Sequence, residues 1–142
     1  MPDTESCVFC KPEQFAWRTI HLGKWATSLV SVPWFRPGHC LVIPNRHAEI
    51  LEQLTDKESS AIIRELGRLA KLLDIGHGTG IMQKHQPLQA PNGIKVNHLH
   101  FHIFPRLENE PELFPVPQPN AFEGFYDPTE SKVIKLVEKL KI

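Results

Sequence analysis

The sequence of 142 residues has no excess of charge of either sign and no long hydrophobic run. Lysine plus arginine and aspartate plus glutamate both number 16, so the formal net charge is zero. A balanced charge lacks the excess of positive charge that is typical of proteins that bind nucleic acid or an anionic membrane surface. A small partner held by a local site fits this composition better.

Signals for export or membrane insertion are also lacking. The first residues have no basic region followed by an apolar run, and no apolar stretch approaches the length that spans a bilayer. Three cysteines are too few for the even, dense disulfide framework of a small secreted domain. These absences predict a cytoplasmic protein whose thiols are free or bind metal.

Length and hydrophobic pattern predict one domain, residues 1–142, of the α+β class. Alternating apolar residues in 16–22 and 25–32, separated by a turn that contains glycine, predict a β-hairpin. Short apolar runs at 39–44 and 81–84 predict further strands. With one more strand near residue 100, we expect an antiparallel sheet of about five strands.

Two segments have a helical period instead. Residues 55–74 begin with capping-box spacing between Thr55 and Glu58, and their apolar residues recur at steps of three and four. This pattern predicts an amphipathic helix packed on the sheet. Pro128 at the first helical position and an acidic first turn predict a final helix near the C-terminus.

The most informative motif is a run of three histidines at two-residue spacing, His98, His100 and His102. In a strand, alternate side chains share a face, so the three imidazoles would stand in a row about 6.6 Å apart. Imidazole is an unusual choice for a purely structural strand, whereas histidine is common at metal and catalytic sites. The three rings could bind Zn²⁺ together with water, or one ring could act as a nucleophile.

Cys7 and Cys10 form a Cys-x-x-Cys pair, which is a common half of a structural zinc site. A tetrahedral ion needs two more nitrogen or sulfur ligands, and the eight histidines of the chain can supply them. A redox pair or a chance spacing is the alternative interpretation of the two cysteines.

Together these motifs resemble the histidine triad (HIT) family, whose signature is His-x-His-x-His followed by apolar residues and, here, by Pro-Arg. Residues 36–44 are similar to the family's Pro-Gly-His strand, and residues 45–47 to its basic-histidine turn. The cysteine pair resembles the zinc-binding start of many bacterial members. The likeness covers about residues 7–106. The C-terminal extension, 107–142, matches nothing in the family.

The resemblance implies a separate role for each triad histidine. His100 would be the nucleophile that attacks the α-phosphorus of a nucleoside 5′-phosphate derivative, and His102 would contact that phosphate. A closed structural Zn²⁺ site would be made of Cys7, Cys10, His47 and His98. If His98 is held in that site, His100 cannot readily share the ion and is left to act on phosphorus.

Further contacts are implied around this centre. The residues expected to contact the ribose and the phosphates are Ser31, Gln83, Asn92 and Gly93. His39, in the Pro-Gly-His strand, is expected to support the triad strand rather than to act in catalysis. The implied partners are a nucleotide or dinucleotide substrate and a second copy of the chain, in a homodimer whose sheets pair across the two-fold axis.

The function predicted from these residues is a nucleotide hydrolase or nucleotidyl transferase that works through a covalent nucleotidyl-histidine. Dinucleoside polyphosphates are the first substrate class expected, and nucleoside phosphoramidates are the second. Two other interpretations stay open. One is a zinc-containing nucleotide-binding module without turnover, and the other is a zinc hydrolase whose metal is bound by the three triad histidines.

Overall fold

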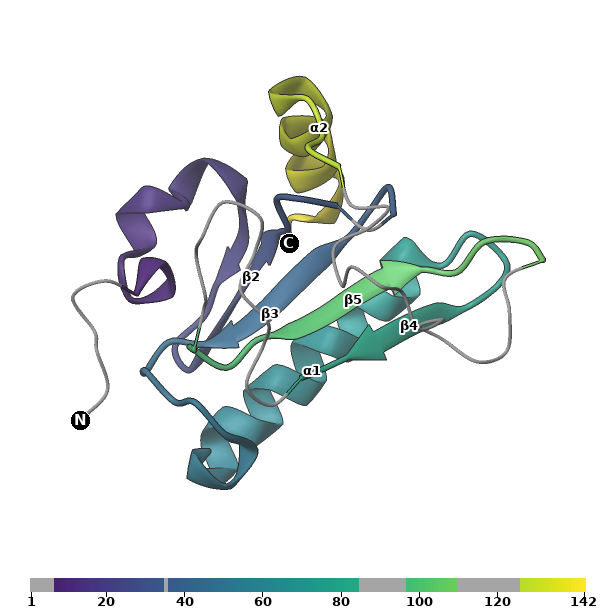
Figure 1. Ribbon diagram of the computed structural model, residues 1–142. Coiled ribbons are helices and arrows are strands. Elements are labelled where there is room, and N and C mark those ends of the chain that lie inside the picture. Colours follow the sequence, from purple (N-terminus) through teal and green to yellow (C-terminus); the bar gives the residue numbers. More distant parts are fainter. Residues whose placement is uncertain (1–6, 35, 85–96, 110–125) are drawn as a thin grey trace, which may run out of the picture.

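Five antiparallel strands and two α-helices form the described part of the chain (Figure 1). The computed structural model describes residues 7–34, 36–84, 97–109 and 126–142. The strands, in sheet order β1-β2-β3-β5-β4, are β1 (Thr19–Leu22), β2 (Ala26–Val30), β3 (Cys40–Pro44), β5 (Phe101–Pro105) and β4 (Thr79–Met82). The predicted α+β class and antiparallel sheet are therefore confirmed.

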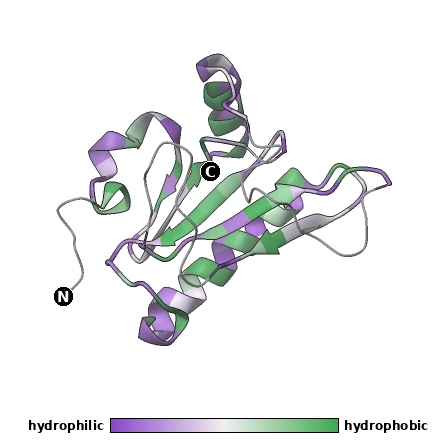
Figure 2. Cartoon of the chain, in the orientation of Figure 1, coloured by the Kyte–Doolittle hydropathy of each residue, from purple (hydrophilic) through white to green (hydrophobic). Residues whose placement is uncertain are grey.

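Helix α1 (Asp56–Leu73) packs across β2, β3 and β5. The Thr55 hydroxyl accepts a hydrogen bond from the Glu58 N–H at 3.2 Å, and the Glu58 carboxylate accepts one from the Thr55 N–H at 2.9 Å. This is the capping box that the sequence predicts. Figure 2 shows hydrophobic and hydrophilic segments alternating along α1, as expected for a helix with one buried stripe. The buried stripe contains Ile62, Leu66, Leu69 and Leu73.

Helix α2 (Glu130–Leu140) begins later than the proline pattern predicts. Its N-cap is Thr129, whose hydroxyl accepts a hydrogen bond from the Lys132 N–H at 3.3 Å. Because a hydroxyl can make this cap and a proline ring cannot, Pro128 lies before the helix and not at its first position. The helix buries Val133, Val137 and Leu140 in the core. That residues 1–142 form one domain stays a prediction.

The strands also differ from the prediction at their ends. Residues expected to begin the hairpin form the 3-10 turn η3 (Ala16–Arg18), and β4 begins at Thr79, before the predicted start at residue 81. The Phe104 ring lies so close to Gly80 that an added Cβ would come 2.5 Å from it, so β4 needs a glycine there. The other 3-10 turns are η1 (Val8–Cys10), η2 (Pro12–Gln14) and η4 (Leu51–Gln53).

Each face of the sheet carries a hydrophobic cluster. One face packs against α1 and α2 through residues that include Val30, Val42 and Ile103. The opposite face packs against the N-terminal 3-10 turns through a second cluster of Phe9, Phe15, Leu29, Leu41 and Ile43. Among the described residues no helix combines the length and the apolar composition needed to cross a bilayer.

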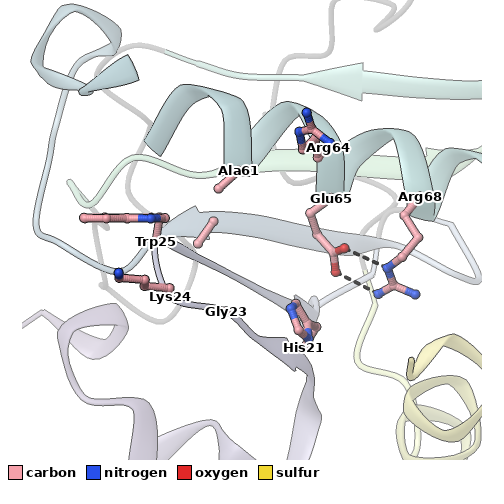
Figure 3. A pocket seen from close by; sticks show the side chains of 9 residues that line it. His21, Gly23, Lys24, Trp25, Ala61, Arg64, Glu65 and Arg68 are labelled. Carbon is pink, nitrogen blue, oxygen red and sulfur yellow. Dashed lines mark hydrogen bonds and ion pairs between the residues drawn. The ribbon is translucent and has the colours of Figure 1, made fainter. Parts of the chain in front are cut away.

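A buried carboxylate ties α1 to the sheet and to α2. Glu65 accepts hydrogen bonds from the Arg68 guanidinium at 2.7 and 2.8 Å (Figure 3). It also accepts one from the Ser28 hydroxyl of β2. Arg68 also donates to the Leu140 carbonyl at 2.6 Å. A pocket of about 280 Å³ lies beside this network, between α1 and the turn that joins β1 to β2. It lies on the side of the sheet that α1 covers.

The Glu58 carboxyl provides a test of how α1 is anchored. The Arg46 guanidinium, with a nitrogen 2.9 Å from the Glu58 carboxylate, lowers the pKa of that carboxyl below its usual value. A carboxyl with a lower pKa in the folded state stabilises the fold above its unfolded pKa, and this contribution is lost as the pH falls through the folded pKa. We expect Glu58→Gln to lower the free energy of unfolding at pH 7 and to weaken its decline below about pH 4.3.

Urea unfolding followed by circular dichroism at a series of pH values measures this effect. Glu138→Gln is the matched control, because Glu138 pairs with Lys141 on the exposed side of α2. Exposed pairs of this kind contribute little to stability. A Glu58→Gln protein whose stability declines with acid as steeply as the wild type would contradict the expectation.

Candidate functional site

The pairing of β3 with β5 brings His39 and His102 together. Leu41 lies opposite His102 in the register, so His102 projects from the sheet face that lies away from α1. Nε2 of His39 lies 2.8 Å from Nδ1 of His102, within hydrogen-bond distance. Gly38 turns the chain into β3 with a φ of 95°, which favours glycine, and Pro105 of β5 packs against this turn. His39 therefore contacts the histidine that it was predicted to support.

The three triad histidines do not share one strand. Only His102 lies within β5, and His98 and His100 precede it. The chain leaves the ladder here because its backbone groups bind elsewhere. The Leu99 N–H donates to the Ala48 carbonyl at 2.6 Å, and the His98 carbonyl lies 2.8 Å from Nδ1 of His100. The predicted row of imidazoles on one strand face is therefore wrong.

His100 is oriented by the hydrogen bond of one ring nitrogen. A carbonyl can only accept, so Nδ1 of His100 donates to the His98 carbonyl, and the neutral ring keeps its lone pair on Nε2. The centroids of the His100 and His102 rings are 5.0 Å apart. Nε2 is thus the atom of His100 that can act as a base or a nucleophile.

Burial keeps the imidazoles of this group neutral. It lowers the pKa of His100, lowers that of His102 well below its usual value, and, together with the nearby His100, lowers the pKa of His39 to about 3. A neutral imidazole is a nucleophile or a hydrogen-bond partner, whereas an imidazolium is neither a base nor a nucleophile. The site therefore offers uncharged rings at neutral pH.

A second cluster, which we call the cysteine–histidine cluster, lies next to the triad. One ligand atom from each of four residues lies within 4.8 Å of the others, and the residues are Cys7, Cys10, His47 and His98. The Sγ atoms of Cys7 and Cys10 lie 3.4 and 3.5 Å from Nδ1 of His98, and Sγ of Cys10 lies 3.1 Å from Nδ1 of His47. The fold thus brings the predicted ligand set together from three separate segments.

Both imidazoles of this cluster have the orientation that a metal ligand requires. Nε2 of His98 donates to the Pro44 carbonyl at 2.8 Å, and Nε2 of His47 donates to the Glu49 carboxylate at 3.0 Å. In each ring Nδ1 then keeps its lone pair and faces the cysteines. Carbonyl and carboxylate partners of this kind orient metal-bound histidines, and two thiolates with two imidazoles suit a closed zinc site. The residues present therefore fit a zinc ion.

Of the remaining predicted site residues, the structure describes Ser31 and Gln83, and both side chains bind backbone carbonyls close by in the chain. Ser31 lies just after β2, and its buried hydroxyl donates to a backbone carbonyl two residues later at 2.8 Å. Gln83 follows β4, and its amide donates to the carbonyl of the next residue at 2.8 Å. Asn92 and Gly93 lie outside the described residues. Their contacts with substrate stay predictions.

Sequence reasoning missed two residues of this region. Glu49 binds His47 from outside the cysteine cluster, and the available signal was an acidic residue two positions after a histidine. Phe9 packs against the rings of His98 and His100, with centroids 5.9 and 5.8 Å away. The signal for Phe9 was its place between the two cysteines.

Comparison with known proteins identifies the family. The family model for the HIT domain matches residues 27–109, which include all of β3, α1, β4 and β5 and all but the first residue of β2. The chain belongs to the HIT family. Among solved structures, a Hit-like protein from Bartonella henselae covers 99% of this chain and 98% of its own, with a TM-score of 0.69 and 21% identity. It shares the HIT fold with this chain.

A solved structure and two curated relatives bear on the chemistry of HIT proteins. A Zn-bound histidine triad family protein from Mycobacterium smegmatis has a TM-score of 0.62 and 20% identity, covering 97% of each chain. An adenosine 5′-monophosphoramidase of Schizosaccharomyces pombe is 29% identical, over 74% of this chain and 77% of its own. An AP-4-A phosphorylase of Mycobacterium tuberculosis is 31% identical, over 59% of this chain and 44% of its own.

Proposed function

We propose that this HIT chain is a hydrolase that transfers a nucleotidyl group from a nucleoside 5′-phosphate derivative to water, with His100 as the nucleophile. The observation that carries the proposal is the hydrogen bond from Nδ1 of His100 to the His98 carbonyl, which leaves the lone pair of Nε2 for attack on phosphorus. His102, held by His39, is the neighbouring ring that contacts the phosphate oxygens.

The reaction consists of two displacements at the α-phosphorus. Nε2 of His100 forms a P–N bond while the bond from phosphorus to the leaving oxygen or nitrogen breaks. Water then breaks the P–N bond and releases the nucleoside monophosphate and the free imidazole. Hydrogen bonds from His102 and from nearby backbone N–H groups stabilise the charge on the nonbridging oxygens.

Two substrate classes share this chemistry. We propose dinucleoside polyphosphates as the first class, because the positive charge of Lys84 lies near His102. Burial is the largest cause of the low pKa of the His102 imidazole, the neighbouring histidines come next, and the charge of Lys84 adds to them. A cation beside the phosphate-binding ring suits a leaving group with several phosphates. Nucleoside phosphoramidates are the second class, favoured by the likeness to the adenosine 5′-monophosphoramidase, which extends over more of this chain than the likeness to the phosphorylase.

The nucleophile is tested by intact-mass measurement during turnover of diadenosine tetraphosphate and of adenosine 5′-phosphoramidate. We expect an adenylyl adduct on the wild type, no adduct on His100→Ala, and a fall in kcat of about 1,000-fold or more in that variant. His77→Ala, in the exposed turn after α1, should leave both unchanged. Turnover that persists in His100→Ala would overturn the assignment, and a wild type that retains nucleotide without forming an adduct would indicate a binding module.

We propose Zn²⁺ as the ion of the cluster formed by Cys7, Cys10, His47 and His98, in a structural role. When bound, the ion supplies a cross-link between three chain segments. Burial raises the pKa of Cys10 to about 12, and a bound cation would keep this thiol ionised. A reducing compartment keeps such thiols available as ligands, which accords with the cytoplasmic location that we propose.

Native mass spectrometry measures the zinc content. We expect one ion per chain in the wild type, and loss of the ion with a lower melting temperature in Cys7→Ala. Cys40→Ala is the matched control, because Cys40 is buried in β3 outside the cluster and its removal leaves the ligands in place. Full zinc content in Cys7→Ala would instead support a metal bound by the triad histidines.

We also propose that the chain forms a homodimer through the β4 edge of its sheet. The other edge strand, β1, is flanked by α2, whereas β4 pairs on one side with β5 and has Ile81 54% exposed. Ile63 on α1 is 64% exposed, and the surface at Gly67 one turn later is open. A second copy would pair with the β4 edge, which no other described strand occupies, and would cover such apolar side chains.

Sedimentation velocity measures the oligomeric state. We expect the wild type to sediment as a dimer, and Ile81→Lys to shift the population to monomer, because a charge at the strand edge opposes pairing. Ile134→Lys, at an exposed position of α2, is the control and should remain dimeric. An Ile81→Lys protein as dimeric as the wild type would place the interface elsewhere.

A further inference from the structure

The short turn η1 and its N-cap, Cys7, carry two candidate metal ligands and one aromatic ring that reaches the triad. Phe9 lies between Cys7 and Cys10 and is 7% exposed. Its ring meets the His98 ring at 88° and the His100 ring at 63°, with centroids 5.9 and 5.8 Å away. Edge-to-face contacts of this kind favour one relative orientation of the rings as well as burying them.

The Phe9 ring is also held from its other side. Phe15 meets it edge to face at 6.0 Å and belongs, with Leu29 and Leu41, to the cluster that covers this side of the sheet. The backbone of the turn is closed by a hydrogen bond of 3.2 Å from the Cys10 N–H to the Cys7 carbonyl. Because a packed core resists displacement of a ring, Phe9 cannot move away from the histidines without opening this cluster.

Among the contacts of His100 in the described part of the chain, two link it to the cysteine–histidine cluster. One is the hydrogen bond from its Nδ1 to the backbone carbonyl of His98, whose own ring faces the cysteines. The other is the ring of Phe9, which is flanked in sequence by the two cysteines. A disturbance of the cluster would loosen both constraints at once.

We infer that Phe9 is a positioning residue for His100, through which the cysteine–histidine cluster controls the orientation of the nucleophile. The inference rests on the proposed function, because it requires His100 to attack phosphorus. A nucleophile misplaced by about 1 Å can lose about 100-fold in rate, so a ring that limits the tilt of His100 can strongly affect the rate of the chemical step. The cluster then has a role in catalysis without touching the substrate.

Three roles of Phe9 predict different kinetics. If Phe9 only fills the hydrophobic cluster that it forms with Phe15, Leu29 and Leu41, its truncation lowers stability and leaves the first chemical step unchanged. If Phe9 contacts the substrate, its truncation raises KM. If Phe9 positions His100, formation of the nucleotidyl-histidine slows while KM stays near that of the wild type.

The test is Phe9→Leu in the full chain loaded with zinc, because leucine keeps an apolar side chain in the hydrophobic cluster and removes the aromatic ring. We expect one zinc per chain by native mass spectrometry, an unchanged KM for diadenosine tetraphosphate, and adduct formation slower by about 10- to 100-fold in quenched-flow mass measurements. Phe9→Tyr, which keeps the ring, should restore the rate. Phe15→Leu makes the same change one ring further from His100, so it should lower stability and slow adduct formation much less than Phe9→Leu does.

A second measurement needs no turnover. In substrate-free protein with labelled histidines, NMR relaxation dispersion of the His100 ring carbons should reveal exchange in Phe9→Leu and in zinc-depleted wild type, but not in the zinc-loaded wild type. A wild-type rate of adduct formation in Phe9→Leu, or a rise in KM alone, would overturn the inference. If the wild type forms no adduct, the proposed function fails, and an unchanged His100 ring in Phe9→Leu would separately refute the ordering of His100 by Phe9.

Discussion

The antiparallel pairing of β3 with β5 is the constraint on which both candidate sites depend. Its register sets Leu41 opposite His102, and the start of β3 then brings His39 within hydrogen-bond distance of that ring. At the other end of β3 the Pro44 carbonyl accepts a hydrogen bond from His98. A slip of one residue would turn His102 toward α1 and separate these partners.

Burial gives the triad region its electrostatic character. Two buried neutral imidazoles can form a hydrogen bond in which one ring nitrogen donates and the other accepts. Nε2 of His39 and Nδ1 of His102, 2.8 Å apart, form such a pair. Burial disfavours a charged ring in the same place and, together with the nearby His100, lowers the pKa of His39 to about 3. In the function that we propose, neutral groups of this region bind a phosphate by directed hydrogen bonds.

The sequence predicts those features whose causes are local. Helix α1 was predictable because Thr55 and Glu58 form their capping box within four residues and the apolar period follows directly. The path of the triad segment was not predictable, because Leu99 leaves the ladder to bind the carbonyl of Ala48, which is distant in sequence. The ligand set of the cysteine cluster was accessible only through the resemblance to the HIT family. The ring orientations set by Pro44 and Glu49 depend on tertiary contacts that no motif contains.

The hydrogen bonds of the triad also bear on which metal chemistry the segment can support. A metal held by all three histidines would need one free ring nitrogen from each. Nε2 of His98 binds the Pro44 carbonyl, and its Nδ1 faces the sulfur atoms of Cys7 and Cys10. His98 can join a three-histidine centre only by losing the hydrogen bond to Pro44 or by turning Nδ1 away from the cysteines. A metal centre with the cysteines instead uses Nδ1 in its present orientation. The geometry thus favours a division of the segment, with the His98 ring turned to the cysteines and its backbone carbonyl orienting His100.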